Sequence, residues 1–437
     1  MKLRKYFNFD LKNYLFVILF LIGIKIVFYE KNFITYDELY SLINYTNYYT
    51  LLLKDNLNNH IINSFFGIII GIFSNKIDYL RFASFLVFLS GIFLLNKSFK
   101  SELTIIFILL CFIFGNNFFV YSFLYRGYPY YFFLFSLAFY FLDQKILTEF
   151  KKKTILIILS ILTALAPSNI LLIFPLIFYF REKFNKKNIF IYYVFLTSLL
   201  IFPNIFITGI YSLRKNINLE NINYLYFYNL DNLINIVLNG LKNYHNLIFN
   251  FYEKVNFTHK IEIFLRDDKI ILYSYLFIIS CIFIKIYKNY KIDNLDKIFV
   301  VHILLIIILS NAPVARVYYP FYVFYFIYID KNLNYYQTKY KIRKKIINLL
   351  LIISLFLCTT LNLDEKLNSN YDISIHYSKV KINSLKYESI LKNNCNIENN
   401  LPNYPLGIDI YYYNYLITCN KKLDIFLIKK IQKNYYK

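Results

Sequence analysis

Two adjacent acids, Asp37 and Glu38, directly follow the first apolar run of the chain, residues 14 to 29. An ionised pair is costly to hold at the edge of a membrane bundle, so it usually has a function there. Thr35 can cap a short helix and place both carboxylates in its first turn, where the helix dipole favours negative charge. A carboxylate at such a place can accept a proton from a hydroxyl group. The competing interpretation is a solvated pair at an ordinary helix start.

Cationic and aromatic residues recur at the ends of other apolar runs, on the side where the acid pair is expected. They come from separate parts of the chain and are His60, Arg81, Arg126, Tyr128, Arg316 and Tyr318. A guanidinium group binds phosphate oxygens in a forked geometry, so these arginines could hold an anion next to a carboxylate base. The ordinary alternative is that arginine and tyrosine side chains anchor the ends of membrane helices.

The composition places these residues in a membrane protein. Of the 437 residues 58% are hydrophobic and 21% aromatic, and the apolar residues fall in long runs between Lys-rich and Asn-rich links. In lipid, each of these apolar runs has to satisfy its own backbone polar groups, and a helix does so. The sequence therefore predicts an all-α polytopic membrane protein. The formal net charge of +23 then reflects basic cytoplasmic loops and predicts no nucleic-acid partner. The first run lacks a small-residue cleavage site and is expected to stay as a span.

The apolar runs predict a bundle of about eleven spans, each needing roughly 20 residues to cross. They lie near residues 14 to 29, 79 to 95, 103 to 121, 129 to 142, 154 to 166, 170 to 180, 189 to 209, 270 to 287, 298 to 311, 317 to 330 and 346 to 361. The shorter run 61 to 73 is expected to lie along the membrane surface. With that assignment the N-terminus and the Lys-rich links all face the cytoplasm.

This topology divides the chain into a transmembrane domain, residues 1 to 361, and a small extracytoplasmic C-terminal region, residues 362 to 437. Long external loops cover residues 30 to 78 and 210 to 269 of the first domain. Cys395 and Cys419 lie in the external tail, where they form either a disulfide or two unpaired thiols. Three further cysteines, Cys111, Cys281 and Cys358, are expected to be buried packing residues. No Cys/His metal-ligand spacing is present.

At the polar residues the chain resembles the GT-C superfamily of membrane glycosyltransferases, which includes protein O-mannosyltransferases and lipid A aminoarabinose transferases. The resemblance covers about the first 330 residues in order and spacing. The matching segments are Asp37-Glu38, Asn59-His60, Leu80-Arg81-Phe82-Ala83-Ser84, Arg126-Gly127-Tyr128 and Arg316-Val317-Tyr318 with Pro320. The chain departs from the family at Ile61, where a Pro usually follows the histidine.

The resemblance implies a hexosyl- or pentosyltransferase that takes its sugar from a polyprenyl-phosphate donor at the extracytoplasmic face of a bacterial inner membrane. The acceptor would be a glycan, a lipid or a protein. Asp37 would be the general base, and Glu38 would orient the acceptor or Asp37. The phosphate would be held by Arg126 and Arg316, with His60 and Arg81 as further candidates.

Tyr128 and Tyr318 would contact the substrate in the same resemblance. Some family members hold a divalent metal near the acid pair, but no ligand spacing in this chain assigns one. Two other classes stay open: a surface-polysaccharide polymerase or ligase of unrelated fold, and a flippase or transporter of lipid-linked sugars without chemistry. A transporter predicts acids and helix breaks at the middle of spans.

Overall fold

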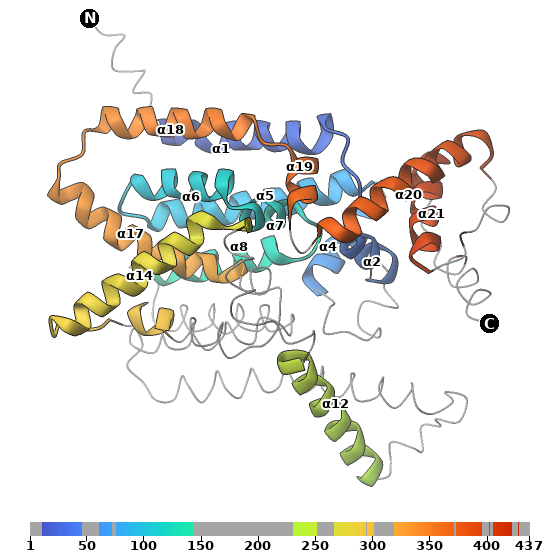
Figure 1. The fold of residues 1–437 in the computed structure, drawn as a ribbon, viewed down its shortest axis with the longest axis horizontal. Helices are drawn as coiled ribbons and strands as arrows, with labels where there is room; N and C mark the ends of the chain where they lie inside the picture. Colours follow the sequence, from blue (N-terminus) through green and yellow to red (C-terminus); the bar gives the residue numbers. More distant parts are fainter. Residues whose placement is uncertain are drawn as a thin grey trace, which may run out of the picture.

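The computed structural model describes residues 11–45, 61–71, 76–143, 230–250, 266–293, 295–300, 319–370, 373–395, 402, 405–421 and 427. These residues form helices and connecting turns, and they contain no β-strand. The predicted all-α class is therefore confirmed for the described part of the chain. Helices of the bundle lie side by side, and a C-terminal group of helices projects from one end (Figure 1).

The bundle begins with α1 (Leu11–Ile24), which continues as the π-helical turn η2 (Lys25–Tyr29) and packs on α5 (Ile77–Ser98). Helix α5 packs most extensively on α8 (Tyr128–Asp143). A Cβ atom at Gly91 of α5 would lie 2.9 Å from the Phe132 ring and 3.2 Å from the backbone of Phe133. The glycine therefore permits the close approach of α5 and α8.

The remaining described elements complete the bundle and its external ends. They are α2 (Tyr36–Tyr45), α4 (Ile61–Gly71), α6 (Leu103–Phe114), α7 (Asn116–Phe123), α12 (Leu230–Asn250), α14 (Lys269–Tyr287), η6 (Tyr319–Phe321), α17 (Tyr322–Lys339), α18 (Lys344–Thr359), α19 (Leu363–Ser369), α20 (Ser374–Asn393) and α21 (Pro405–Thr418). The apolar run starting at residue 61 forms α4, which packs on α2.

Membrane spans are supported in part. Among the described helices, α5 alone is long and apolar enough to cross a bilayer, and the count rises to three if two bent helix pairs are each one span. The predicted spans at 154 to 166, 170 to 180 and 189 to 209, and most of the one at 298 to 311, lie outside the described residues. The architecture is compatible with a membrane protein, and the predicted number of eleven spans is not confirmed.

The apolar run predicted as a span near residues 103 to 121 forms two helices with a sharp break between them. Helices α6 and α7 meet at Gly115 with a bend of 88°. The two new helix ends carry polar partners: Lys366 donates to the carbonyl oxygen of Ile113 at 2.9 Å, and Asp268 accepts from the Asn117 side chain at 2.7 Å. A cation at a helix C-terminus matches the helix dipole, which stabilises the end of α6.

A second bend of 81° separates α18 from α19. The Asn362 side chain caps α19 by accepting from the backbone of Glu365 at 3.1 Å. Helix α19 then packs on α7, where Asn370 donates to Asn117 at 2.8 Å. The C-terminal end of α19 therefore joins the start of α7 in a buried polar cluster of Asn117, Asp268 and Asn370.

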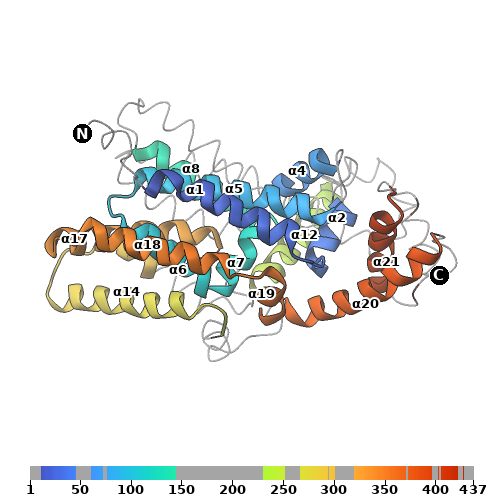
Figure 2. The same ribbon diagram turned by 90° about the horizontal axis from the view of Figure 1, so that it is seen from above.

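The described part of the C-terminal region is helical. Helices α20 and α21 pack on each other and on α2, at one end of the molecule (Figure 2). A disulfide joins Cys395 to Cys419, which decides between the two alternatives that the sequence leaves open. Cys111 and Cys358 are buried and Cys281 is partly exposed, and none of them is in a disulfide.

Candidate functional site

The acid pair occupies the first turn of α2, and Thr35 is the residue before it. The backbone nitrogen of Glu38 donates to the Thr35 hydroxyl at 3.3 Å, while the Glu38 carboxylate accepts from the Thr35 backbone at 3.0 Å and from its hydroxyl at 2.9 Å. This reciprocal arrangement is a capping box, which satisfies helix N-terminal donors. The predicted capping role of Thr35 is confirmed, and it fixes the direction in which Glu38 points.

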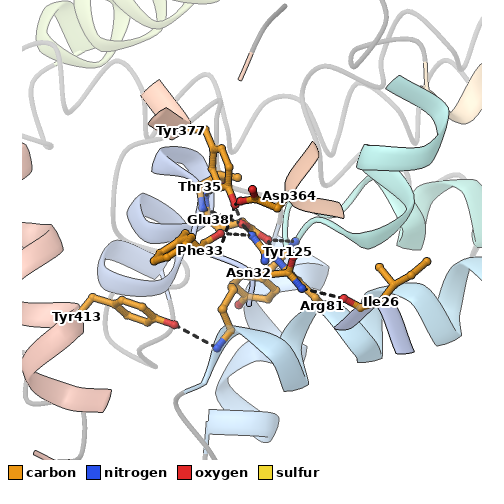
Figure 3. A network of polar contacts seen from close by, with 11 residues as sticks. Ile26, Asn32, Phe33, Thr35, Glu38, Arg81, Tyr125, Asp364, Tyr377 and Tyr413 are labelled. Atoms are coloured by element: carbon orange, nitrogen blue, oxygen red, sulfur yellow. Dashed lines mark hydrogen bonds and ion pairs between the residues drawn. The ribbon is translucent and has the colours of Figure 1, made fainter. Parts of the chain in front are cut away.

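Glu38 points inward and forms a fully buried ion pair with Arg81 of α5. The Arg81 Nη2 and Nε atoms lie 2.6 Å and 2.9 Å from the two carboxylate oxygens, and both side chains are 0% exposed. Glu38 also accepts from the backbone nitrogen of Tyr125 at 3.0 Å. Arg81 further donates to the Phe33 carbonyl oxygen at 2.8 Å (Figure 3). The pair therefore joins α2, α5 and the turn before α8.

Burial alone would raise the pKa of the Glu38 carboxyl. The charge of Arg81, its hydrogen bonds and the donors of Tyr125 and Thr35 outweigh that effect, so the pKa is lowered from its ordinary value. Glu38 is therefore held ionised and is a poor proton acceptor. Of its two predicted roles, orienting the acceptor or orienting Asp37, complete burial favours the second.

Asp37, the neighbour of Glu38, has a different environment. Its side chain is 30% exposed, and its Oδ2 atom lies 3.5 Å from Nη2 of Arg126. Arg126 is only 2% exposed and donates to the Ser41 hydroxyl of α2 at 3.0 Å and to the Asp37 carbonyl oxygen at 3.5 Å. The acid pair is thus divided between one accessible carboxylate next to a guanidinium group and one internal carboxylate.

The other sequence-predicted residues have different outcomes. Arg81 has two nitrogens on Glu38 and is fully buried, so its geometry favours a positioning role over the predicted contact with a donor phosphate. Tyr128, the first residue of α8, is 5% exposed, and its ring lies 5.0 Å from that of Tyr121 and 6.2 Å from that of Tyr319. The predictions for His60, Arg316 and Tyr318 lie outside the described residues.

A second adjacent acid pair, Asp267 and Asp268, was missed at the sequence level. Both side chains are buried at the start of α14. Burial raises the pKa of Asp268 to about 7, against hydrogen bonds from Asn117 that lower it. The signal was present, because Asp267 and Asp268 are a second adjacent acid pair at the end of an apolar run, here directly before it.

A metal site is not assigned by the described residues. They contain no group of three or more His, Cys, Asp or Glu that could hold a metal ion. The polar groups at the N-terminal end of α2 are carboxylates and hydroxyls of that helix and the nearby guanidinium group of Arg126, and they suit proton transfer and anion binding.

No family model, curated protein or solved structure matches this chain. The functional argument therefore depends on the geometry of the site.

Proposed function

We propose that the protein transfers a sugar from a polyprenyl-phosphate donor to an acceptor at the extracytoplasmic membrane face. The observation that carries this proposal is the partly exposed carboxylate of Asp37 next to the guanidinium group of Arg126, on a helix whose second acid, Glu38, is buried in an ion pair. The site therefore offers one base and one cation where a hydroxyl acceptor and a phosphate leaving group have to meet.

The reaction proceeds in one displacement at the anomeric carbon. The Asp37 carboxylate takes the proton of the acceptor hydroxyl, and the acceptor oxygen forms a bond to the anomeric carbon. The bond from that carbon to the phosphate oxygen breaks, and polyprenyl phosphate leaves with the electron pair. Arg126 stabilises the charge on the leaving phosphate. Arg316 and His60 stay candidates for the same task.

The surrounding contacts suit a preorganised site. Thr35 and Glu38 fix the first turn of α2, and Arg126 is held by the Ser41 hydroxyl from the next turn. A base that is already in place loses less conformational freedom in the transition state. Tyr128, two residues after Arg126, is 5% exposed and packs on the rings of Tyr121 and Tyr319, which favours a packing role over the predicted substrate contact.

The test is whether the purified protein cleaves a lipid-linked sugar. The chain is reconstituted in vesicles with a labelled polyprenyl-phosphate sugar and hydroxyl acceptors, and free polyprenyl phosphate is measured by mass spectrometry. The proposal predicts release of polyprenyl phosphate together with a glycosylated acceptor. An intact donor in every condition, with normally folded protein, would overturn it.

A second candidate, transport of a lipid-linked sugar without chemistry, is favoured by one specific observation. Helix pairs α6/α7 and α18/α19 are both broken, and the α6/α7 break lies next to buried Asp268, which accepts from Asn117. Broken helices with an internal acid are a common design of transporter sites. In the same vesicles a transporter would move the donor across the bilayer intact, and Asp268→Asn would abolish that movement while Asp37→Asn would not.

A further inference from the structure

The C-terminal region contacts the segment that carries the acid pair. Helices α20 and α21 both pack on α2, and their buried side chains share one apolar cluster with α2. Its α2 members include Leu39, Leu42 and Ile43, and those from the C-terminal region include Val380 and Tyr411. A tail segment more than 300 residues away in sequence is therefore part of the structure that holds α2.

Polar contacts give this packing a defined geometry. The hydroxyl group of Tyr377, on α20, donates to Asp364 of α19 at 2.7 Å and accepts from the backbone nitrogen of Phe33 at 3.3 Å. Lys381 binds the other oxygen of Asp364 at 2.7 Å, which leaves the carboxylate fixed from two sides. The Tyr377 side chain is fully buried.

Phe33 is the link to the acid pair. Its backbone nitrogen binds Tyr377, and its carbonyl oxygen accepts from Arg81, which in turn is paired with Glu38. Figure 3 shows Tyr377 and Asp364 next to the pair formed by Glu38 and Arg81. A continuous set of hydrogen bonds thus runs from α19 and α20 to the first turn of α2.

Two further contacts support the same attachment. The carboxylate of Glu30 accepts from the backbone nitrogen of Leu363 at 3.0 Å. The hydroxyl of Tyr413 on α21 accepts from the backbone nitrogen of Ile77, the first residue of α5, at 3.3 Å. Both ends of the Glu38–Arg81 pair, the α2 segment and the start of α5, are therefore bound by the C-terminal region.

We propose that Tyr377 is a positioning residue: its hydroxyl group fixes the Phe33 backbone and thereby holds the first turn of α2, with Asp37, in its working orientation. The C-terminal region is then an integral part of the site. The expected effect of Tyr377 on sugar transfer rests on the proposed function, whereas its expected effect on the position of α2 does not.

The test uses Tyr377→Phe in the full-length protein, because this change removes one oxygen and keeps the buried ring. The matched control is Tyr415→Phe on α21, whose partly buried ring packs on Tyr412 and whose hydroxyl has no hydrogen bond in the described structure. Hydrogen exchange measured by mass spectrometry reports on residues 33 to 45, with residues 344 to 359 as an internal reference.

Tyr377→Phe should increase exchange in residues 33 to 45 by about fivefold, the factor that one ordinary hydrogen bond contributes. The reference helix and the Tyr415→Phe protein should exchange as the parent does. Unchanged exchange, or an equal increase in both variants, would overturn the inference.

The catalytic readout is separate. In the transfer assay Tyr377→Phe should lower kcat by about fivefold and leave the KM for donor unchanged, because orientation of the base matters in the transition state. If Tyr377→Phe only reduces the amount of folded protein, kcat per folded molecule stays unchanged. That result would contradict a positioning role in catalysis. If exchange rises while the parent transfers no sugar, the attachment of α2 is supported and the proposed function is overturned.

Discussion

Replacement of Arg81 by Met tests the internal half of the site. The substitution keeps most of the side-chain volume and removes the guanidinium group that lies 2.6 Å and 2.9 Å from the two oxygens of Glu38. Because both side chains are 0% exposed, Glu38 is left as a buried charge with only its backbone and hydroxyl donors. Breaking a buried pair on one side costs about 3–5 kcal/mol, and we expect that loss in the free energy of unfolding.

The assay is equilibrium unfolding in detergent micelles, followed by circular dichroism. Glu38→Gln should also destabilise the protein, and the double variant should lose less than the sum of the two single changes, by about 2–3 kcal/mol. The matched control is Lys31→Met, which removes a surface pair with Glu388 at 3.4 Å in which Lys31 is 65% exposed. Surface pairs contribute below about 1 kcal/mol.

Equal effects of Arg81→Met and Lys31→Met, both below about 1 kcal/mol, would refute the burial argument. Additive single changes would do the same, because they would show that Glu38 and Arg81 do not interact.

Four further outcomes follow from the structure. Arg126→Lys should raise the KM for donor by about tenfold in the transfer assay, because lysine lacks the two-point fork. Gly115→Ala should lower unfolding stability by about 1–3 kcal/mol, since its Cβ would lie 2.5 Å from a carbonyl oxygen of the preceding turn. Replacing Cys395 and Cys419 by Ser should destabilise the C-terminal helices by about 3 kcal/mol in chemical unfolding. Because its pKa is lowered, ionised Glu38 stabilises the fold at pH values above the ordinary glutamate pKa of about 4.3, and this contribution is lost as the pH falls through the folded-state pKa. The free energy of unfolding of Glu38→Gln should therefore fall less steeply with decreasing pH than that of the parent.

Local sequence signals predicted the parts of the structure that depend on neighbouring residues. Thr35 and Glu38 have the spacing of a capping box, and the structure contains that box. The apolar runs gave most of the described bundle helices, because burial in a helical bundle needs continuous apolar residues.

Long-range pairing could not be predicted in the same way. Arg81 lies 43 residues from Glu38, and an arginine at the start of an apolar run has the same sequence pattern whether it pairs internally or faces a substrate. The break at Gly115 depends on Lys366 and Asp268, which come from distant segments. Glycine alone does not specify a bend, because it is tolerated inside helices at a modest cost.

The measurement that tests the central proposal most directly is sugar transfer by Asp37→Asn, a change that removes the negative charge and keeps the shape. With purified protein at saturating donor and acceptor, we predict a loss of at least about 100-fold in kcat, the usual contribution of a general base. The control is the same substitution on α12, Asp231→Asn, which should keep the parental activity. Both variants should unfold as the parent does. Activity of Asp37→Asn within a few-fold of the parent would contradict the assignment of Asp37 as the base.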